Sequence, residues 1–266
     1  MGNLTGRVAV VTGAASGIGK AAASLLARQG VHVAILDRNE EQARVTAEEL
    51  TRAGHEAREW VADVADAEKM GAAMQQIWDH WGRLDIVFAN AGMNGVFASL
   101  DELTLEDWNA TLSTNLTGTF VTIKSAFPYL KKQGAGSIIV TSSINGTRSF
   151  GLLGATAYSV SKAGQIALMK MLALELAPAN IRVNAICPGY VVDTNMKNRL
   201  RGIEKFKFRG GSPEDSFPLG GIPARAEQIA EAVVFLASDA SAYITGTELW
   251  IDGAHSLAVG VNRPGE

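Results

Sequence analysis

The sequence contains a single cysteine, Cys187, so no disulfide can form within the chain. Chains without disulfides are typical of reducing compartments. No apolar run approaches the roughly 20 residues that a membrane span requires. The first residues also lack the basic and apolar regions of a signal peptide. We therefore expect a cytoplasmic protein that makes no contact with a membrane.

Positive charge and metal-ligand patterns are scarce as well. The formal net charge is −3, whereas a protein that neutralises phosphates presents a basic face, so we expect no nucleic-acid partner. The four histidines are His32, His55, His80 and His255. None of them has a cysteine or carboxylate at metal-ligand spacing, and we therefore expect no metal site.

What the chain does contain is an alternation of short apolar runs and amphipathic helical patterns. The runs predict strands at Val8–Thr12, Val31–Leu36, Glu56–Val61, Leu84–Ala89, Ser137–Thr141, Ile181–Ile186 and Thr247–Ile251. Helical patterns fall at Ile18–Gln29, Glu40–Ala53, Ala67–Trp81, from Thr104 onward, at Tyr158–Leu176 and at Ala226–Ala237. Strands this apolar are covered on both faces. Right-handed crossovers then give one α/β domain over residues 1–266, a doubly wound, seven-stranded parallel sheet of the Rossmann type with helices on both faces.

A glycine-rich turn follows the first predicted strand and opens the first predicted helix. Gly13, Gly17 and Gly19 fall in the segment TGAASGIG. Glycines there permit a tight turn and let backbone N–H groups approach a pyrophosphate at the helix N-terminus. The turn therefore predicts a dinucleotide site.

The residue after the second strand predicts which dinucleotide binds. Asp37 lies 18 residues after Gly19. A carboxylate there accepts hydrogen bonds from the ribose hydroxyls of adenosine and repels a 2′-phosphate, which favours NAD over NADP. Arg38 follows and is able to reach a phosphate, but Ser16 occupies the turn position where NADP enzymes of this type commonly carry arginine or lysine. The balance favours NAD.

A phenol and an ammonium share one face of a predicted helix. Tyr158 and Lys162 are separated by one helical turn. A tyrosine with a pKa near 10 is a poor base at neutral pH, and a neighbouring ammonium favours the phenolate. The pair therefore predicts acid–base chemistry.

Seven motifs in order resemble those of the classical short-chain dehydrogenase/reductase family over nearly the whole chain. They are the turn Thr12–Gly19, the pair Asp63-Val64, the triplet Asn90-Ala91-Gly92, the helix residue Asn115, the serine region Thr141-Ser142-Ser143, the pair Tyr158 and Lys162, and Pro188-Gly189. Ser143 fits the family pattern better than Ser142, which stays the alternative. The gap from Ser143 to Tyr158 is 15 residues, about two longer than in many members.

The resemblance implies hydride transfer between a secondary alcohol and nicotinamide. Tyr158 is then the acid or base, Ser143 binds the substrate oxygen, Lys162 lowers the tyrosine pKa and binds ribose, and Asn115 holds a water that links Lys162 to solvent. The implied cofactor-binding residues are Gly13, Ser16, Gly17, Ile18, Gly19, Asp37, Arg38, Asp63, Val64, Asn90, Ala91, Gly92, Tyr158, Lys162, Pro188, Gly189, Val191 and Thr194. The implied substrate contacts are Ser143, Tyr158, Met93, Asn94, Asn145 and Tyr190.

Three other functions remain open beside an NAD-dependent alcohol dehydrogenase. A 3-oxoacyl carrier-protein reductase uses the same residues, although it usually takes NADPH, which Asp37 disfavours. A non-catalytic dinucleotide sensor would not need the catalytic set. A nucleotide-sugar epimerase is typically longer and has a different glycine spacing. Members of the family commonly form homotetramers through the helix that carries Tyr158 and the region of the last strand, and we expect the same here.

The long irregular stretch at about 190–225 predicts a substrate lid. Its basic part runs from Lys197 to Arg209 and holds six basic residues against one acid, Glu204. A local positive field attracts anions, so this segment either recruits an anionic substrate or is a solvated surface of the lid.

Overall fold

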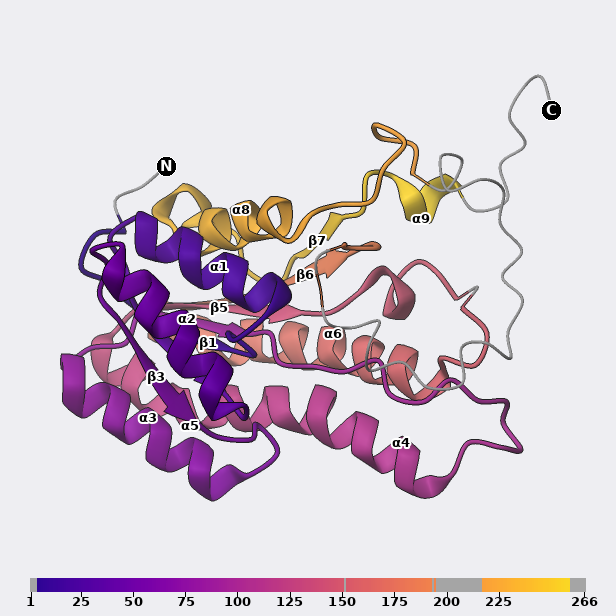
Figure 1. Cartoon of the computed structure of the whole chain (residues 1–266), viewed down its shortest axis with the longest axis horizontal. Coiled ribbons are helices and arrows are strands. Elements are labelled where there is room, and N and C mark those ends of the chain that lie inside the picture. Colours follow the sequence, from indigo (N-terminus) through magenta and orange to yellow (C-terminus); the bar gives the residue numbers. More distant parts are fainter. Residues whose placement is uncertain (1–3, 151, 193, 195–216, 259–266) are drawn as a thin grey trace.

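A computed structural model describes residues 4–150, 152–192, 194 and 217–258. Figure 1 shows a single sheet with helices along it. The sheet is seven-stranded with all neighbours parallel, in the order β3-β2-β1-β4-β5-β6-β7. The strands are β1 Val8–Thr12, β2 His32–Asp37, β3 Ala57–Val61, β4 Ile86–Ala89, β5 Gly136–Thr141, β6 Ile181–Pro188 and β7 Glu248–Ile251. This arrangement confirms the predicted doubly wound fold.

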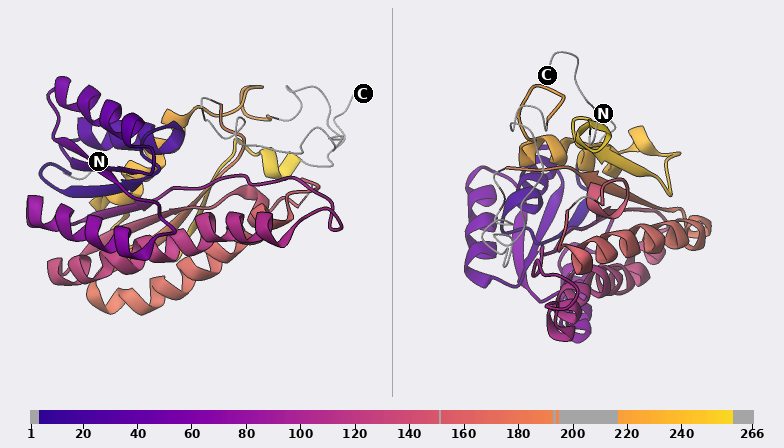
Figure 2. Two further views of the ribbon diagram at one scale, coloured as in Figure 1. Left: turned by 60° about the horizontal axis from the view of Figure 1, so that its bottom comes forward. Right: turned by 90° about the vertical axis from the view of Figure 1, so that its right-hand side faces the viewer.

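The helices lie on both faces of this sheet. They are α1 Gly17–Arg28, α2 Glu40–Arg52, α3 Ala67–Trp81, α4 Leu105–Leu112, α5 Gly118–Gln133, α6 Thr156–Leu176, α8 Ala226–Ala237 and α9 His255–Ala258. Shorter turns are η1 Ser113–Thr117, η2 Ile144–Gly146, η3 Ala177–Ala179 and η6 Asp239–Ser241. Figure 2 shows that α3, α5 and α6 cover one face, whereas α1 and α8 cover the other.

Local side chains and glycines set where several helices begin and end. The side chains of Asn39, Asp66 and Thr104 cap α2, α3 and α4, each accepting a hydrogen bond from a backbone N–H of the first turn. Gly82 and Gly134 end α3 and α5 in the left-handed conformation, with φ of 68° and 77°. The expected opening of a helix at Thr104 is therefore confirmed.

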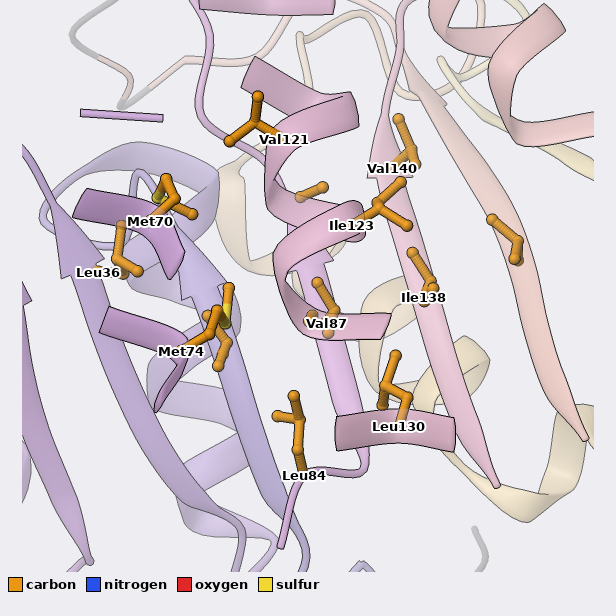
Figure 3. Packing of buried hydrophobic residues seen from close by; sticks show 14 of the residues in the cluster. Leu36, Met70, Met74, Leu84, Val87, Val121, Ile123, Leu130, Ile138 and Val140 are labelled. Carbon is orange, nitrogen blue, oxygen red and sulfur yellow. The ribbon is translucent and has the colours of Figure 1, made fainter. Parts of the chain in front are cut away.

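Two apolar cores lie on opposite faces of the sheet. The core beneath α3, α5 and α6 includes the residues labelled in Figure 3: Leu36, Met70, Met74, Leu84, Val87, Val121, Ile123, Leu130, Ile138 and Val140. The core beneath α1, α2 and α8 takes the alternate strand positions, such as Val11, Ile35 and Phe88. The inner strands therefore bury both faces, whereas the edge strands β3 and β7 stay partly exposed, and the carboxyl ends of the strands are the part left for chemistry.

The structure differs from the predicted elements at several boundaries; strand β4, for example, begins at Ile86 rather than at Leu84. The helix expected from Thr104 is interrupted by the π-helical turn η1. The helix expected from Tyr158 begins two residues earlier, at Thr156. Strand β6 continues through Cys187 to Pro188. Most of the expected lid, including the basic segment 197–209, lies outside the described residues.

Candidate active site

The turn between β1 and α1 has a backbone conformation and a close packing that require glycine. Gly13 and Gly17 have φ of 65° and 53°, which is the left-handed region. A Cβ on Gly19 would lie 2.1 Å from the carbonyl oxygen of Gly13. The turn therefore brings the first N–H groups of α1 to the edge of the sheet, where such groups bind a phosphate. Ser16 is the N-cap residue of α1, and Ile18 is partly exposed beside it.

Asn90 ties this turn to the ends of three strands. Its side-chain nitrogen donates to the carbonyl of Thr12 at 3.1 Å, and its side-chain oxygen accepts from the hydroxyl of Thr141 at 3.0 Å. The backbone N–H groups of Asn90 and Ala91 both donate to the Thr12 hydroxyl. A Cβ on Gly13 would lie 3.0 Å from the Cα of Ala91. The Asn90 side chain therefore holds the predicted cofactor cradle in shape.

The acidic residues expected near adenosine lie at the ends of β2 and β3. The Asp37 carboxylate accepts from the backbone N–H of Ala15 in the glycine-rich turn at 3.2 Å and from that of Asn39 at 3.0 Å. Arg38 forms an ion pair with Asp63 at 3.6 Å, and both side chains are exposed. Val64 is buried against α5, where a Cβ on Gly118 would lie 2.5 Å from it. Asp37, Arg38 and Asp63 thus share one edge of the cradle, and the Val64 side chain belongs to the core.

The segment after β6 closes the cradle from the opposite side. A Cβ on Gly189 would lie 2.8 Å from the Cβ of Asp252, so the chain needs glycine after Pro188. Val191 pairs with Ala224 in an isolated bridge. The Cβ of Thr194 lies 3.4 Å from the position that a Cβ on Gly17 would take. Thr194 therefore faces the glycine-rich turn.

Tyr158 and Ser143 meet beyond the end of β5. Tyr158 is 8% exposed. Burial raises the pKa of the Tyr158 phenol, and a hydrogen bond with the Ser143 side chain lowers it by less. Ser142 is instead turned inward, and its hydroxyl donates to the carbonyl of Lys162 at 2.8 Å. Of the two serines that the sequence left open, Ser143 is therefore the one at the phenol.

Lys162 lies below the tyrosine ring with its ammonium buried. Its Nζ donates to the carbonyl of Thr141 at 2.7 Å and lies 5.6 Å from the centroid of the Tyr158 ring. Burial lowers the pKa of Lys162 to about 8. Burial thus acts on both groups in the same sense, because it disfavours the charged form of each.

Asn115 is the fourth member of the expected catalytic set, and it is fully buried. Its Oδ1 accepts from the backbone N–H of Met93 at 2.8 Å, and its Nδ2 donates to the Met93 carbonyl at 2.9 Å and to the Ser161 hydroxyl at 3.0 Å. A Cβ on Gly92 would lie 3.3 Å from Asn115 Oδ1 and 3.6 Å from Lys162 Nζ. The side chains of Asn115 and Lys162 therefore both approach the backbone at Gly92.

The expected substrate contacts are distributed around Tyr158. Met93 follows Gly92 next to Asn115, and Asn145 donates its backbone N–H to the Ser143 hydroxyl at 3.2 Å. The Tyr190 ring lies 6.0 Å from that of Phe217. Asn94 is partly buried. The structure thus places Met93 next to Asn115 and Asn145 next to Ser143.

Sequence reasoning missed an apolar cluster on the Tyr158 ring. Phe97 and Ala155 are buried with Tyr158, and Leu152 packs against them. A backbone hydrogen bond from Ala98 to Gly154 holds their two loops together at 3.1 Å. The apolar letters after Gly95 were the available signal, but the pairing of the two loops is a tertiary contact that no local pattern encodes.

Neither a group of metal ligands nor a membrane-spanning helix is found among the described residues. No group of three or more histidine, cysteine or carboxylate side chains there is able to hold a metal ion. No helix among the described residues is long and apolar enough to cross a membrane. Cys187 is buried behind Ser142, and burial raises the pKa of its thiol to about 12.

Comparisons with known proteins fit this arrangement. A family model described as enoyl-(acyl carrier protein) reductase matches residues 13–255. A curated relative is the cis-4-hydroxycyclohexanecarboxylate dehydrogenase of Sinomonas cyclohexanicum, 39% identical, with 94% of this chain and 96% of the relative covered. Among solved structures, a 3-ketoacyl-ACP reductase from Sinorhizobium meliloti is 44% identical with a TM-score of 0.89, covering 94% of this chain and 99% of that one. Carveol dehydrogenase from Mycobacterium avium, solved with NAD, is 30% identical with a TM-score of 0.87, covering 97% and 100%.

Proposed function

The chain belongs to the short-chain dehydrogenase/reductase family of oxidoreductases, and on that premise we propose that it interconverts a secondary alcohol and a ketone with NAD(H). The observation that carries the proposal is the contact of the Ser143 side chain with the buried Tyr158 phenol, one helical turn from Lys162. A dinucleotide sensor without catalysis would need none of these groups. The fit of a nicotinamide dinucleotide is supported by the turn from Gly13 to Gly19, whose close packing on itself admits no Cβ at Gly19 and brings the first N–H groups of α1 to the edge of the sheet.

Each residue of the set has a separate part in the proposed reaction. The chemistry that a nicotinamide dinucleotide would supply, when bound, is hydride transfer. Tyr158 takes the proton from the alcohol oxygen during oxidation and returns it to the carbonyl oxygen during reduction. Ser143 donates a hydrogen bond to the same oxygen and orients it. Lys162, when protonated, favours the phenolate form of Tyr158.

NAD is proposed over NADP because of the charges at the edge of the cradle. The Asp37 carboxylate lies against the glycine-rich turn, and Arg38 is paired with Asp63. A 2′-phosphate beside Asp37 would meet a like charge. Replacing Asp37 with alanine should weaken NAD binding about 10- to 100-fold, the loss expected for hydrogen bonds to a charged acceptor. Titrations of both cofactors against both proteins measure this, and wild-type protein that prefers NADP would contradict it.

A second candidate is a 3-oxoacyl-thioester reductase, favoured by the 44% identity to a 3-ketoacyl-ACP reductase over 94% of this chain. The two candidates differ in cofactor and substrate. A panel of secondary alcohols, ketones and an acetoacetyl thioester, followed at 340 nm with NAD(H) and NADP(H), separates them. We expect turnover of a free alcohol or ketone with NAD(H). Turnover confined to the thioester with NADPH would select the reductase, and binding of NAD without any turnover would select a sensor.

The expected partner is a second copy of the chain. We propose a homotetramer that pairs the outer face of α6, where Met171 and Leu174 are 65% and 77% exposed. An exposed apolar stripe on a long helix is typical of a subunit interface. The basic segment 197–209, for which the sequence left recruitment of an anionic substrate open, lies outside the described residues.

A further inference from the structure

The backbone carbonyl of Asn115 accepts two hydrogen bonds from buried side chains. The Thr119 hydroxyl donates to it at 2.7 Å, and Gln165 Nε2 donates to it at 2.8 Å. Gln165 Nε2 also lies 2.7 Å from the Thr119 hydroxyl oxygen, so the three groups close a ring. Asn115 belongs to the π-helical turn η1, whose wider spacing departs from the regular α-helical ladder. Two side chains, one from α5 and one from α6, thus hold this carbonyl.

The orientation of the Gln165 amide follows from its partners. A carbonyl oxygen only accepts, so the nitrogen of Gln165 has to face Asn115. The other amide atom, Gln165 Oε1, is buried and makes no hydrogen bond within the described part of the protein. An unpaired buried acceptor is unfavourable, and an apolar side chain of the same length would avoid it. What glutamine contributes at position 165 is therefore its two donated bonds.

The held turn leads directly to the catalytic groups. The Asn115 side chain bonds both backbone atoms of Met93, and it donates to Ser161, whose hydroxyl donates in turn to the carbonyl of Tyr158 at 2.7 Å. Gly92 lies between Asn115 and the Lys162 ammonium. A shift of the turn would therefore move the segment after β4 and the first turn of α6 together.

We propose that Gln165 and Thr119 are positioning residues of the active site. They fix the carbonyl of Asn115, and through the Asn115 side chain they set the segment at Gly92 and Met93 against Lys162 and Tyr158. This inference rests on the proposed acid–base role of that set. Neither residue contacts the reacting atoms, so both act through Asn115.

Two threonines one turn apart on the same helix give a matched test. Thr119 and Thr122 are both buried, and each donates its hydroxyl to the carbonyl four residues earlier at 2.7 Å. Only Thr119 reaches Asn115. Thr119→Val and Gln165→Met should each lower kcat about tenfold, the effect of one lost hydrogen bond in the upper part of its usual range, with the Kd for NAD within twofold. Thr122→Val should lose comparable thermal stability and keep kcat.

A double-mutant cycle separates positioning from a general loss of stability. Once Asn115→Ala has removed the amide through which Gln165 acts, Gln165→Met should cost no further kcat. Losses that multiply in the double variant, or equal kcat values for Thr119→Val and Thr122→Val, would overturn the inference.

Hydrogen exchange gives a readout that does not depend on activity. The N–H of Met93 is bonded to Asn115 Oδ1, so it should exchange up to about tenfold faster in Gln165→Met and Thr119→Val than in wild type or Thr122→Val. Unchanged protection at Met93 would contradict the positioning role even if the wild-type enzyme is active. If Met93 exchanges faster in the two variants but the wild-type protein shows no turnover, the positioning of Met93 is supported and the proposed reaction is rejected.

Discussion

Burial sets the chemistry of Tyr158 and Lys162 before any partner binds. Both side chains are nearly sealed from solvent, so each is held toward its neutral form, which raises the phenol pKa and lowers the ammonium pKa. The neutral pair and the phenolate–ammonium pair hold the same number of protons and differ only in which residue carries one of them.

Removing the phenol oxygen tests the acid–base role. Tyr158→Phe keeps the ring that packs against Phe97 and Ala155, but it cannot transfer a proton. We expect kcat to fall at least about 10²–10⁴-fold with little change in NAD affinity. Steady-state rates and a cofactor titration on both proteins measure this. A variant that keeps a tenth of the wild-type kcat would show that another group moves the proton.

The buried ammonium should leave a signature in the pH dependence of stability. The pKa of Lys162 is about 8 in the folded protein, against 10.5 for the free side chain. The unfolded chain therefore holds more protons between these values, and stability should rise with pH across that window. Lys162→Met removes this titration, so the unfolding free energy of wild type relative to the variant should increase by about 1–3 kcal/mol from pH 7 to pH 10.

Urea unfolding of both proteins at several pH values measures this difference. Groups that titrate elsewhere contribute equally to the two proteins and cancel in the comparison. A constant or falling difference over pH 7–10 would mean that Lys162 is no harder to protonate in the folded state.

At the scale of elements, the sequence predicted what depends on neighbours along the chain. Apolar runs located the strands to within one or two residues, and Thr104 with Asp107 located the start of α4, because caps and strand cores are local patterns. The π-helical turn η1 was not predicted, and the bond that its Asn115 carbonyl accepts from Gln165 of another helix is a tertiary contact that no local pattern encodes. The order of motifs named the residues that the structure gathers beyond β5, but not the loop contact between Ala98 and Gly154 beside the buried cluster of Phe97, Ala155 and Tyr158.

Two helical glycines with different surroundings test how the turn after β1 is built. A Cβ on Gly19 would lie 2.1 Å from a carbonyl oxygen, whereas nothing lies within 4 Å of one on Gly71 in α3. Gly71→Ala should stabilise the protein by up to about 1 kcal/mol, since alanine is the better helix former. Gly19→Ala should destabilise it by about 1–3 kcal/mol and abolish dinucleotide binding. Thermal unfolding and a cofactor titration measure both, and a Gly19→Ala protein with intact binding would show that the turn tolerates a side chain.

At the scale of the whole molecule, helices cover both faces of the sheet, and helix α6 still exposes the apolar side chains of Met171 and Leu174 to solvent. Figure 2 shows α6 at the outside of its layer. Apolar contacts between copies would cover Met171 and Leu174 and fix the layer that carries Tyr158.

Charge on this face should therefore break the proposed assembly. We expect wild type to elute at four chain masses in light-scattering chromatography. The double variant Met171→Glu, Leu174→Lys should elute at a smaller size, because charges buried at an interface are unfavourable. Leu100→Lys is the matched control, since Leu100 is 86% exposed and lies on the loop before α4 rather than on the exposed face of α6 that carries Met171 and Leu174. A monomeric wild type, or a double variant that stays tetrameric, would place the interface elsewhere or remove it.

Asn90 joins the ends of β1, β4 and β5 through bonds that use no atom of the loops at 94–104 and 148–155. The two loops meet each other above Tyr158, while the strand ends below them are already fixed. Insertions or replacements in these loops consequently leave the strand ends in place. The molecule is divided into a part that must stay constant and a part that is free to diversify, and grafting both loops together from a relative should transplant a preference for one alcohol without rebuilding the nucleotide cradle.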